Sequence, residues 1–122
     1  MAVSTKALLR EMFRLHAQAR AAHEHHVAYH ALAGALHAAE SLADQEACVR
    51  IGLIAREHGE SIDALEPQHP LSRASAEQRG HESIFKQLAV MAHSARLRMQ
   101  IPDPKNEGRP KAPLRKAKKR KP

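Results

Sequence analysis

Histidine is the residue type through which this chain could do chemistry, because it is frequent and unevenly placed. Six of the ten histidines fall between residues 16 and 37. Four of these six are spaced seven residues apart, which is nearly two turns of an α-helix: His16, His23, His30 and His37. Neutral imidazole is a common ligand of Zn²⁺, Cu²⁺ and Ni²⁺. The spacing therefore indicates helical histidine stripes, and metal binding is the chemistry they could support.

Helical phase predicts different environments for these histidines. At about 100° per residue, four histidines share the apolar faces of three expected helices: His16, His23, His58 and His81. His26 and His30 are four residues apart and could chelate a metal from one helical face. We expect the candidate ligands of Zn²⁺ or another divalent transition metal at six positions: His16, His23, His26, His30, His58 and His81. The alternative for the inward histidines is partial burial with a hydrogen bond to a carbonyl or carboxylate.

The familiar motifs of helical metalloenzymes are absent. HExxH does not occur, and the Glu-x-x-His pair of ferritin-like bundles occurs only at Glu66 and His69, in a proline-containing loop. Ser83 and Lys86 match S-x-x-K without its companion motifs. Cys48 lies on an apolar helical face, where a thiol is usually an inert packing group. We therefore predict no catalytic residue, lean against an enzyme, and expect no cofactor unless the histidines bind a metal.

The composition predicts an all-α domain. Hydrophobic residues make up 43% of the chain but aromatic residues only 2%, so alanine and aliphatic side chains supply the core. Alanine is the best helix former, and residues typical of strands are scarce. We expect a small three-to-four-helix bundle built on αα-hairpins. Its segments run from Ser4 to about residue 24, roughly from 26 to 43, from Asp44 to before Pro67, and from Ser75 to before Pro102.

Capping residues and apolar phase support these boundaries. Asp44 is a good N-cap for the third segment, and Ser75 forms a capping box with Gln78 at the start of the fourth. The apolar direction turns by nearly half a turn around residues 23–26. Either the helix breaks there or one long helix changes its packing partner, and we favour the break.

A separate basic segment follows the helices. Residues 105–122 hold nine lysines and arginines against Glu107 alone, a net charge of +8, so the other 104 residues carry −1 of the chain's total of +7. The prolines of this segment exclude a continuous helix. We expect a helical domain over residues 1–102 and a disordered Lys/Arg/Pro-rich tail over 103–122. The nucleic-acid-binding residues are expected to be Lys111, Arg115, Lys116, Lys118, Lys119, Arg120 and Lys121.

The charge of this tail predicts a polyanionic partner. Lysine and arginine neutralise phosphates and release counterions, which gives affinity that is independent of sequence. Without an aromatic residue to stack on bases, the tail is not expected to select single strands. A solubilising tail, a nuclear-import cluster or a site for anionic lipids remain alternatives. Additional apolar stripes on two helices favour a homo-oligomer or a helical protein partner: Val49 and Leu53, and Val90, Leu97 and Ile101.

The sequence thus predicts a non-enzymatic helical interaction or oligomerisation module whose basic arm contacts nucleic acid or another polyanion. The alternative is a histidine-based metal-binding or metal-sensing protein. No apolar run approaches the length of a membrane span. The single cysteine suits a reducing compartment, so we expect a cytoplasmic location.

Overall fold

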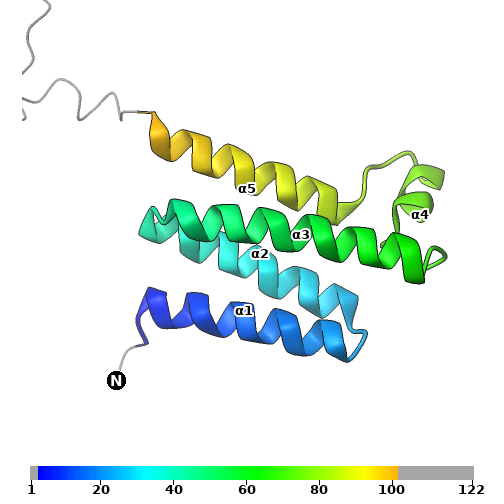
Figure 1. The fold of residues 1–122 in the computed structure, drawn as a ribbon, viewed down its shortest axis with the longest axis horizontal. Helices are drawn as coiled ribbons and strands as arrows, with labels where there is room; N and C mark the ends of the chain where they lie inside the picture. The colour runs from blue at the N-terminus through cyan, green and yellow to red at the C-terminus, as the bar shows by residue number, and fades with distance from the viewer. Residues whose placement is uncertain (1–2, 102–122) are drawn as a thin grey trace, which may run out of the picture.

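The structure is a computed structural model and describes residues 3–101. These residues form five α-helices and no strand, which confirms the all-α prediction (Figure 1). The helices are α1 (Thr5–Ala21), α2 (His25–Leu42), α3 (Gln45–Leu65), α4 (Arg73–Gln78) and α5 (Ile84–Gln100). The expected tail and its boundary with the helical domain lie outside the described residues. Within the described range, no helix combines the length and apolar character needed to cross a membrane.

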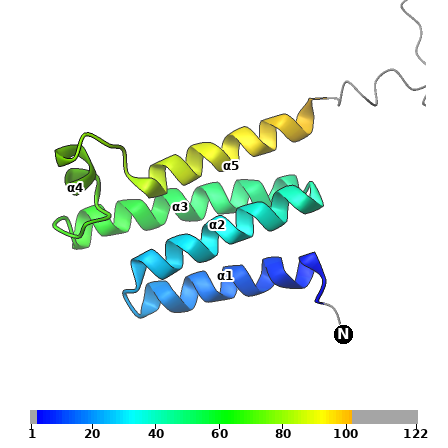
Figure 2. The ribbon, with the colours of Figure 1, turned by 180° about the vertical axis from the view of Figure 1, so that it is seen from behind.

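The four long helices lie side by side in chain order, and consecutive ones run in opposite directions (Figure 1, Figure 2). α1 packs on α2, α2 packs on α3, and α3 packs on α5, so that α1 and α5 form the outer edges. The short helix α4 lies beyond the end of α3, in the connection to α5. This path brings the loop between α1 and α2 to the same end of the bundle as the C-terminus of α3.

The structure confirms the break between the first two helices and the predicted N-cap at Asp44, and it shows a further N-cap at Ser4, where the first segment was expected to begin. Ser4 Oγ accepts a hydrogen bond from Ala7 N at 3.0 Å, and Asp44 Oδ1 accepts one from Ala47 N at 3.0 Å. Between α1 and α2 the chain turns through residues 22–24. There His23 takes a positive φ of 60°, so a histidine occupies the left-handed conformation that glycine most easily adopts.

The predicted start of the fourth helix is wrong. Ser72, not Ser75, caps α4, because its hydroxyl accepts a hydrogen bond from Ser75 N at 3.1 Å. α4 then ends, Gly80 follows at a φ of 76°, and Ser83 caps a separate helix, α5. Consequently His81 lies in the connection and is exposed, whereas its helical phase predicted an apolar environment.

The core is built mainly from small and aliphatic side chains. Its fully buried members lie on α2, α3 and α5: Ala28, Leu32, Ala35, Ala39, Ile51, Ala55, Phe85, Leu88 and Ala92. Val49 and Leu53 on α3 and Val90 and Leu97 on α5 are exposed, which agrees with their phase outside the main apolar faces. Self-association through these residues stays a prediction.

Ala43, between α2 and α3, provides a test of the helix termination. Its φ of 52° and ψ of 41° are left-handed, which costs a residue with a Cβ atom about 1–2 kcal/mol. Glycine avoids this strain but loses about 0.5–1 kcal/mol through the entropy of the unfolded chain. We expect Ala43→Gly to raise the free energy of unfolding, measured by urea denaturation, by up to about 1 kcal/mol.

Ala22→Gly is the matched control, because Ala22 also caps a helix but has a right-handed φ of −88°. There only the entropic cost applies, so this variant is expected to lose stability. Equal destabilisation by both substitutions would contradict the assigned turn geometry.

Candidate metal centre

Three buried imidazoles form a hydrogen-bonded row across the bundle, which we call the histidine relay: His16 on α1, His58 on α3 and His25 at the start of α2. Nε2 of His16 lies 2.9 Å from Nδ1 of His58, and Nε2 of His58 lies 2.9 Å from Nδ1 of His25. The three residues are 4%, 0% and 5% exposed, respectively. The relay thus joins three helices through side chains that are withdrawn from water.

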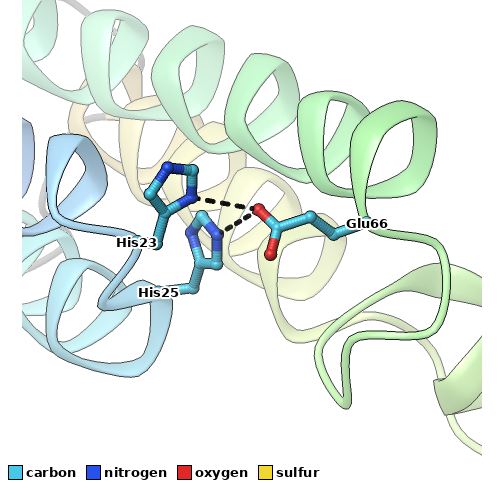
Figure 3. Close-up of side chains that lie close together, drawn as sticks. All are labelled: His23, His25 and Glu66. Atoms are coloured by element: carbon cyan, nitrogen blue, oxygen red, sulfur yellow. Dashed lines mark hydrogen bonds and ion pairs between the residues drawn. The ribbon is translucent and has the colours of Figure 1, made fainter.

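The relay ends at a cluster that faces the solvent, which we call the metal triad: His23, His25 and Glu66 (Figure 3). Nε2 of His25 lies 2.9 Å from Oε2 of Glu66, and Nδ1 of His23 lies 3.4 Å from the same oxygen. The His23 side chain is 76% exposed and that of Glu66 is 34% exposed. The triad therefore combines one buried metal-ligand atom with two ligand atoms that an ion can reach from solvent.

Helix ends bring these three residues together. His23 stands in the turn after α1, His25 is the first residue of α2, and Glu66 is the C-cap of α3. Because the α1–α2 loop and the end of α3 share one end of the bundle, residues 41 and 43 positions apart come into contact.

Phe85 of α5 closes the relay on its apolar side. Its ring centroid lies 4.4 Å from that of His58. Gly59 permits this approach, since a Cβ atom at position 59 would stand only 3.0 Å from Cβ of Phe85. The aromatic wall excludes water from His58, and desolvation disfavours the charged imidazolium.

The environment of the relay disfavours charge. Burial lowers the pKa of His58 to about 3, and the nearby His16, Arg20 and His25 add to this effect. Burial also lowers the pKa of His16, again with a contribution from the Arg20 guanidinium. Arg20 is held beside His16 by an ion pair with Glu57, in which its Nη2 lies 2.8 Å from Oε2. His58 and His16 are therefore neutral at physiological pH.

Hydrogen-bond roles follow from the carboxylate of Glu66. The hydrogen bond from His25 holds the pKa of this carboxyl below its usual range, and an ionised carboxylate only accepts hydrogen bonds. His25 must therefore donate from Nε2, and in the neutral form its Nδ1 accepts from Nε2 of His58. By the same logic Nδ1 of His58 accepts from Nε2 of His16. In this arrangement every relay imidazole carries its proton on Nε2.

His69 borders the triad but is bound elsewhere. Its ring packs edge-on against His25 with the centroids 5.0 Å apart, and its Nδ1 accepts a hydrogen bond from Leu71 N at 3.0 Å. Burial lowers the pKa of His69. The Glu66 and His69 pair thus lies in a loop, as its prolines predicted, and contributes one residue to the triad.

Sequence reasoning located part of this site. His16 and His58 are buried and in contact, as their phase predicted, whereas the inward prediction for His23 is wrong, as it is for His81. His26 and His30 are exposed on α2, outside the triad. The residues proposed to bind nucleic acid lie outside the described part of the chain: Lys111, Arg115, Lys116, Lys118, Lys119, Arg120 and Lys121.

His25 and Glu66 were not among the predicted metal ligands, although the apolar pattern of α2 does indicate that His25 is buried. His25 stands three residues before Ala28 and seven before Leu32, so it shares the buried face of α2. Glu66 gave no such signal, because it follows the last turn of α3 and its position depends on the path of the chain.

Comparisons of the chain with models of known protein families, with curated proteins and with solved structures find no match. The function of this chain is therefore inferred from the geometry of the site.

The buried neutral imidazoles predict a loss of stability on acidification. The unfolded chain binds a proton at each histidine near pH 6.5, whereas folded His58 does so only near pH 3. The contribution of neutral His58 to the free energy of unfolding is complete above about pH 6.5 and is lost progressively as the pH falls toward 3. We expect the free energy of unfolding to fall between pH 7.5 and 5, by up to about 1.4 kcal/mol per pH unit for each such histidine.

Urea denaturation at several pH values measures this slope. His58→Leu is expected to reduce it, and His37→Gln is the control, because His37 is exposed on α2. The lowered pKa values of Glu57 and Glu66 add a further loss only below about pH 4.5, outside this window. A free energy of unfolding that stays constant from pH 7.5 to 5 would contradict the neutral relay.

Proposed function

We propose that this chain is a histidine-based metal-binding helical protein that takes Zn²⁺ or another divalent transition metal at the metal triad. One observation carries this proposal. Each member of the triad offers one ligand atom, these atoms lie within 4.8 Å of one another, and one of them belongs to a buried imidazole. Imidazole nitrogen together with carboxylate oxygen is a typical donor set for Zn²⁺.

The spacing of the donors supports an ion between them. Ligand atoms about 2.0–2.1 Å from a tetrahedral ion are about 3.3 Å from one another. His23 Nδ1 and Glu66 Oε2 are already 3.4 Å apart, while His25 Nε2 and Glu66 Oε2, at 2.9 Å, would separate by a few tenths of an ångström. The ligand atoms of His23 and His25 lie within 4.8 Å of one another, and rotation of the accessible His23 side chain would bring them closer.

His58 supplies the support that a metal-binding histidine usually has. A histidine that ligates a metal through one nitrogen commonly donates a hydrogen bond from the other, which fixes the orientation of its ring. Nδ1 of His25 lies 2.9 Å from Nε2 of the buried His58. His25 is thus held with Nε2 directed toward Glu66 before any ion arrives.

Metal binding at this site would join segments that are distant in sequence. The triad takes its donors from the α1–α2 turn, the first residue of α2 and the end of α3. Three protein ligands leave a coordination position for water or a donor from a partner, as in open zinc sites. Occupancy would therefore stabilise one end of the bundle, which suits a protein that senses a metal.

We expect Zn²⁺ to stabilise the untagged full-length protein. At a free concentration 100 times its Kd, a ligand of the folded state adds about 2.7 kcal/mol, which raises Tm by roughly 10 °C in a domain of this size. A chelator should reverse the shift. His25→Ala and Glu66→Gln should each remove most of it, because each loses a ligand. Thermal melting with and without zinc, together with titration calorimetry, measures both effects.

His37→Ala provides the matched control, since it removes an exposed histidine from α2 without touching the triad. Its zinc response should equal that of the wild type. The same zinc-dependent shift in wild type and His25→Ala would contradict the proposed site.

As a second function we propose that residues 105–122 bind nucleic acid or another polyanion. The supporting observation is the charge distribution: this segment carries +8 while the rest of the chain carries −1. Cations at this density neutralise phosphates with little regard to sequence. The helical domain would then serve as the module that carries this arm.

Truncation after residue 104 tests this second function. If about six of the nine cations contact phosphates, log K for duplex DNA should fall against log salt with a slope of about −5 for the full chain. The truncated chain should lose binding and keep its helical circular dichroism spectrum. Fluorescence anisotropy at about 50 and 200 mM salt measures the difference. Equal binding by both chains would place the polyanion site on the helices.

A further inference from the structure

We infer that a metal at the triad reverses the direction of the hydrogen bonds along the histidine relay and turns Nδ1 of His16 from an acceptor into a donor. This inference rests on the proposed function, and it concerns how the occupancy of the site is transmitted through the buried His58 to His16.

The metal-free state sets the starting direction. Glu66 accepts from Nε2 of His25, so each relay imidazole holds its proton on Nε2 and accepts through Nδ1 where it has a partner. Nδ1 of His16 is the last acceptor of the row. Among residues 3–101 it is the relay nitrogen without a hydrogen-bond partner.

Metal binding imposes the opposite direction. The ion needs the lone pair of His25 Nε2, so the proton of this imidazole must lie on Nδ1, which then donates to Nε2 of His58. A neutral imidazole has one N–H group. His58 therefore carries its proton on Nδ1 and donates to Nε2 of His16, whose own proton then lies on Nδ1.

The protons balance without a change of charge in the relay. One proton leaves Nε2 of His25 for solvent when the metal binds. One shifts from His58 Nε2 to His25 Nδ1, and one from His16 Nε2 to His58 Nδ1. Water supplies the last one to His16 Nδ1. Each imidazole thus keeps the same number of protons, in accord with the lowered pKa values of His16 and His58.

Burial makes this coupling strict. His58 is 0% exposed and both of its nitrogens are taken up by relay partners, so water cannot substitute for either hydrogen bond. A buried nitrogen left without its partner costs about 1–3 kcal/mol. When His25 changes from acceptor to donor, His58 must follow, and His16 must follow His58.

The far end of the relay lies at a cavity of about 560 Å³ between α1 and α3. His16 lines this cavity together with Phe13, Arg20, Arg50 and Ile54, and His23 of the triad borders it as well. In this proposal, water in the cavity is the source of the proton that His16 gains at Nδ1. The hydrogen-bonding character of the cavity would thus report whether the triad holds a metal.

Nitrogen NMR of the full chain tests the inference. The protein is labelled with ¹⁵N-histidine and kept at pH 8, above the ordinary imidazole pKa of about 6.5. Protonated and unprotonated ring nitrogens have well-separated shifts, and Zn²⁺ is diamagnetic, so both states can be observed. Without metal, His16 and His58 should be protonated on Nε2. With saturating Zn²⁺ both should be protonated on Nδ1, while exposed His37 should not change.

Titration calorimetry on the same sample separates the two proposals. If zinc does not bind, the proposed function fails and this inference fails with it. If zinc binds while His16 stays protonated on Nε2, this inference alone is overturned. The His16 signals are assigned by their absence from the spectrum of His16→Gln.

His58→Leu interrupts the relay and leaves all three triad residues in place. In this variant the His16 spectrum should be the same with and without zinc. A His16 tautomer that still changes on zinc binding would show that the relay does not carry the effect. The wild-type comparison decides the question even where this variant fails to fold.

Discussion

Three imidazoles in the interior of a small helical bundle impose the constraint on which the rest of this structure depends. A buried ring nitrogen is costly unless it has a partner, and a buried imidazolium is costlier still. His16, His58 and His25 pair five of their six ring nitrogens by bonding to one another in a row that ends on a carboxylate. The row holds three helices in register at one end, because a shift of any one of them would leave ring nitrogens unpaired.

The remainder of the core is compatible with this polar row because its side chains are small. Alanine allows the helices to approach closely, and the larger Phe85 lies against His58. Gly59 leaves room for Phe85 because it has no Cβ atom. The histidine relay thus lies in the same interior as an apolar aromatic ring. Because this ring excludes water from the relay, the hydrogen bonds of the relay are directional and strong.

Sequence predicts this fold best where a cap and an apolar period coincide, as at Asp44. His16 and His58 are predictable for the same reason, since they lie well inside helices whose phase is clear. Helical phase predicts nothing beyond the end of a helix. It therefore predicts the wrong environment for His23 and His81, which lie in connections between helices. Glu66 follows the last turn of its helix, so only the tertiary path of the chain reveals its contact with His25.

The position of α1 at the edge of the bundle has a dynamic consequence. The backbone of this helix packs along α2 alone, and its side chains reach α3 at Phe13, His16 and Arg20. Segments with few neighbours are the first to open in local unfolding. Whenever α1 detaches, His16 leaves the row and His58 meets water. The time for which the imidazoles act as one unit is therefore set by how long α1 stays docked.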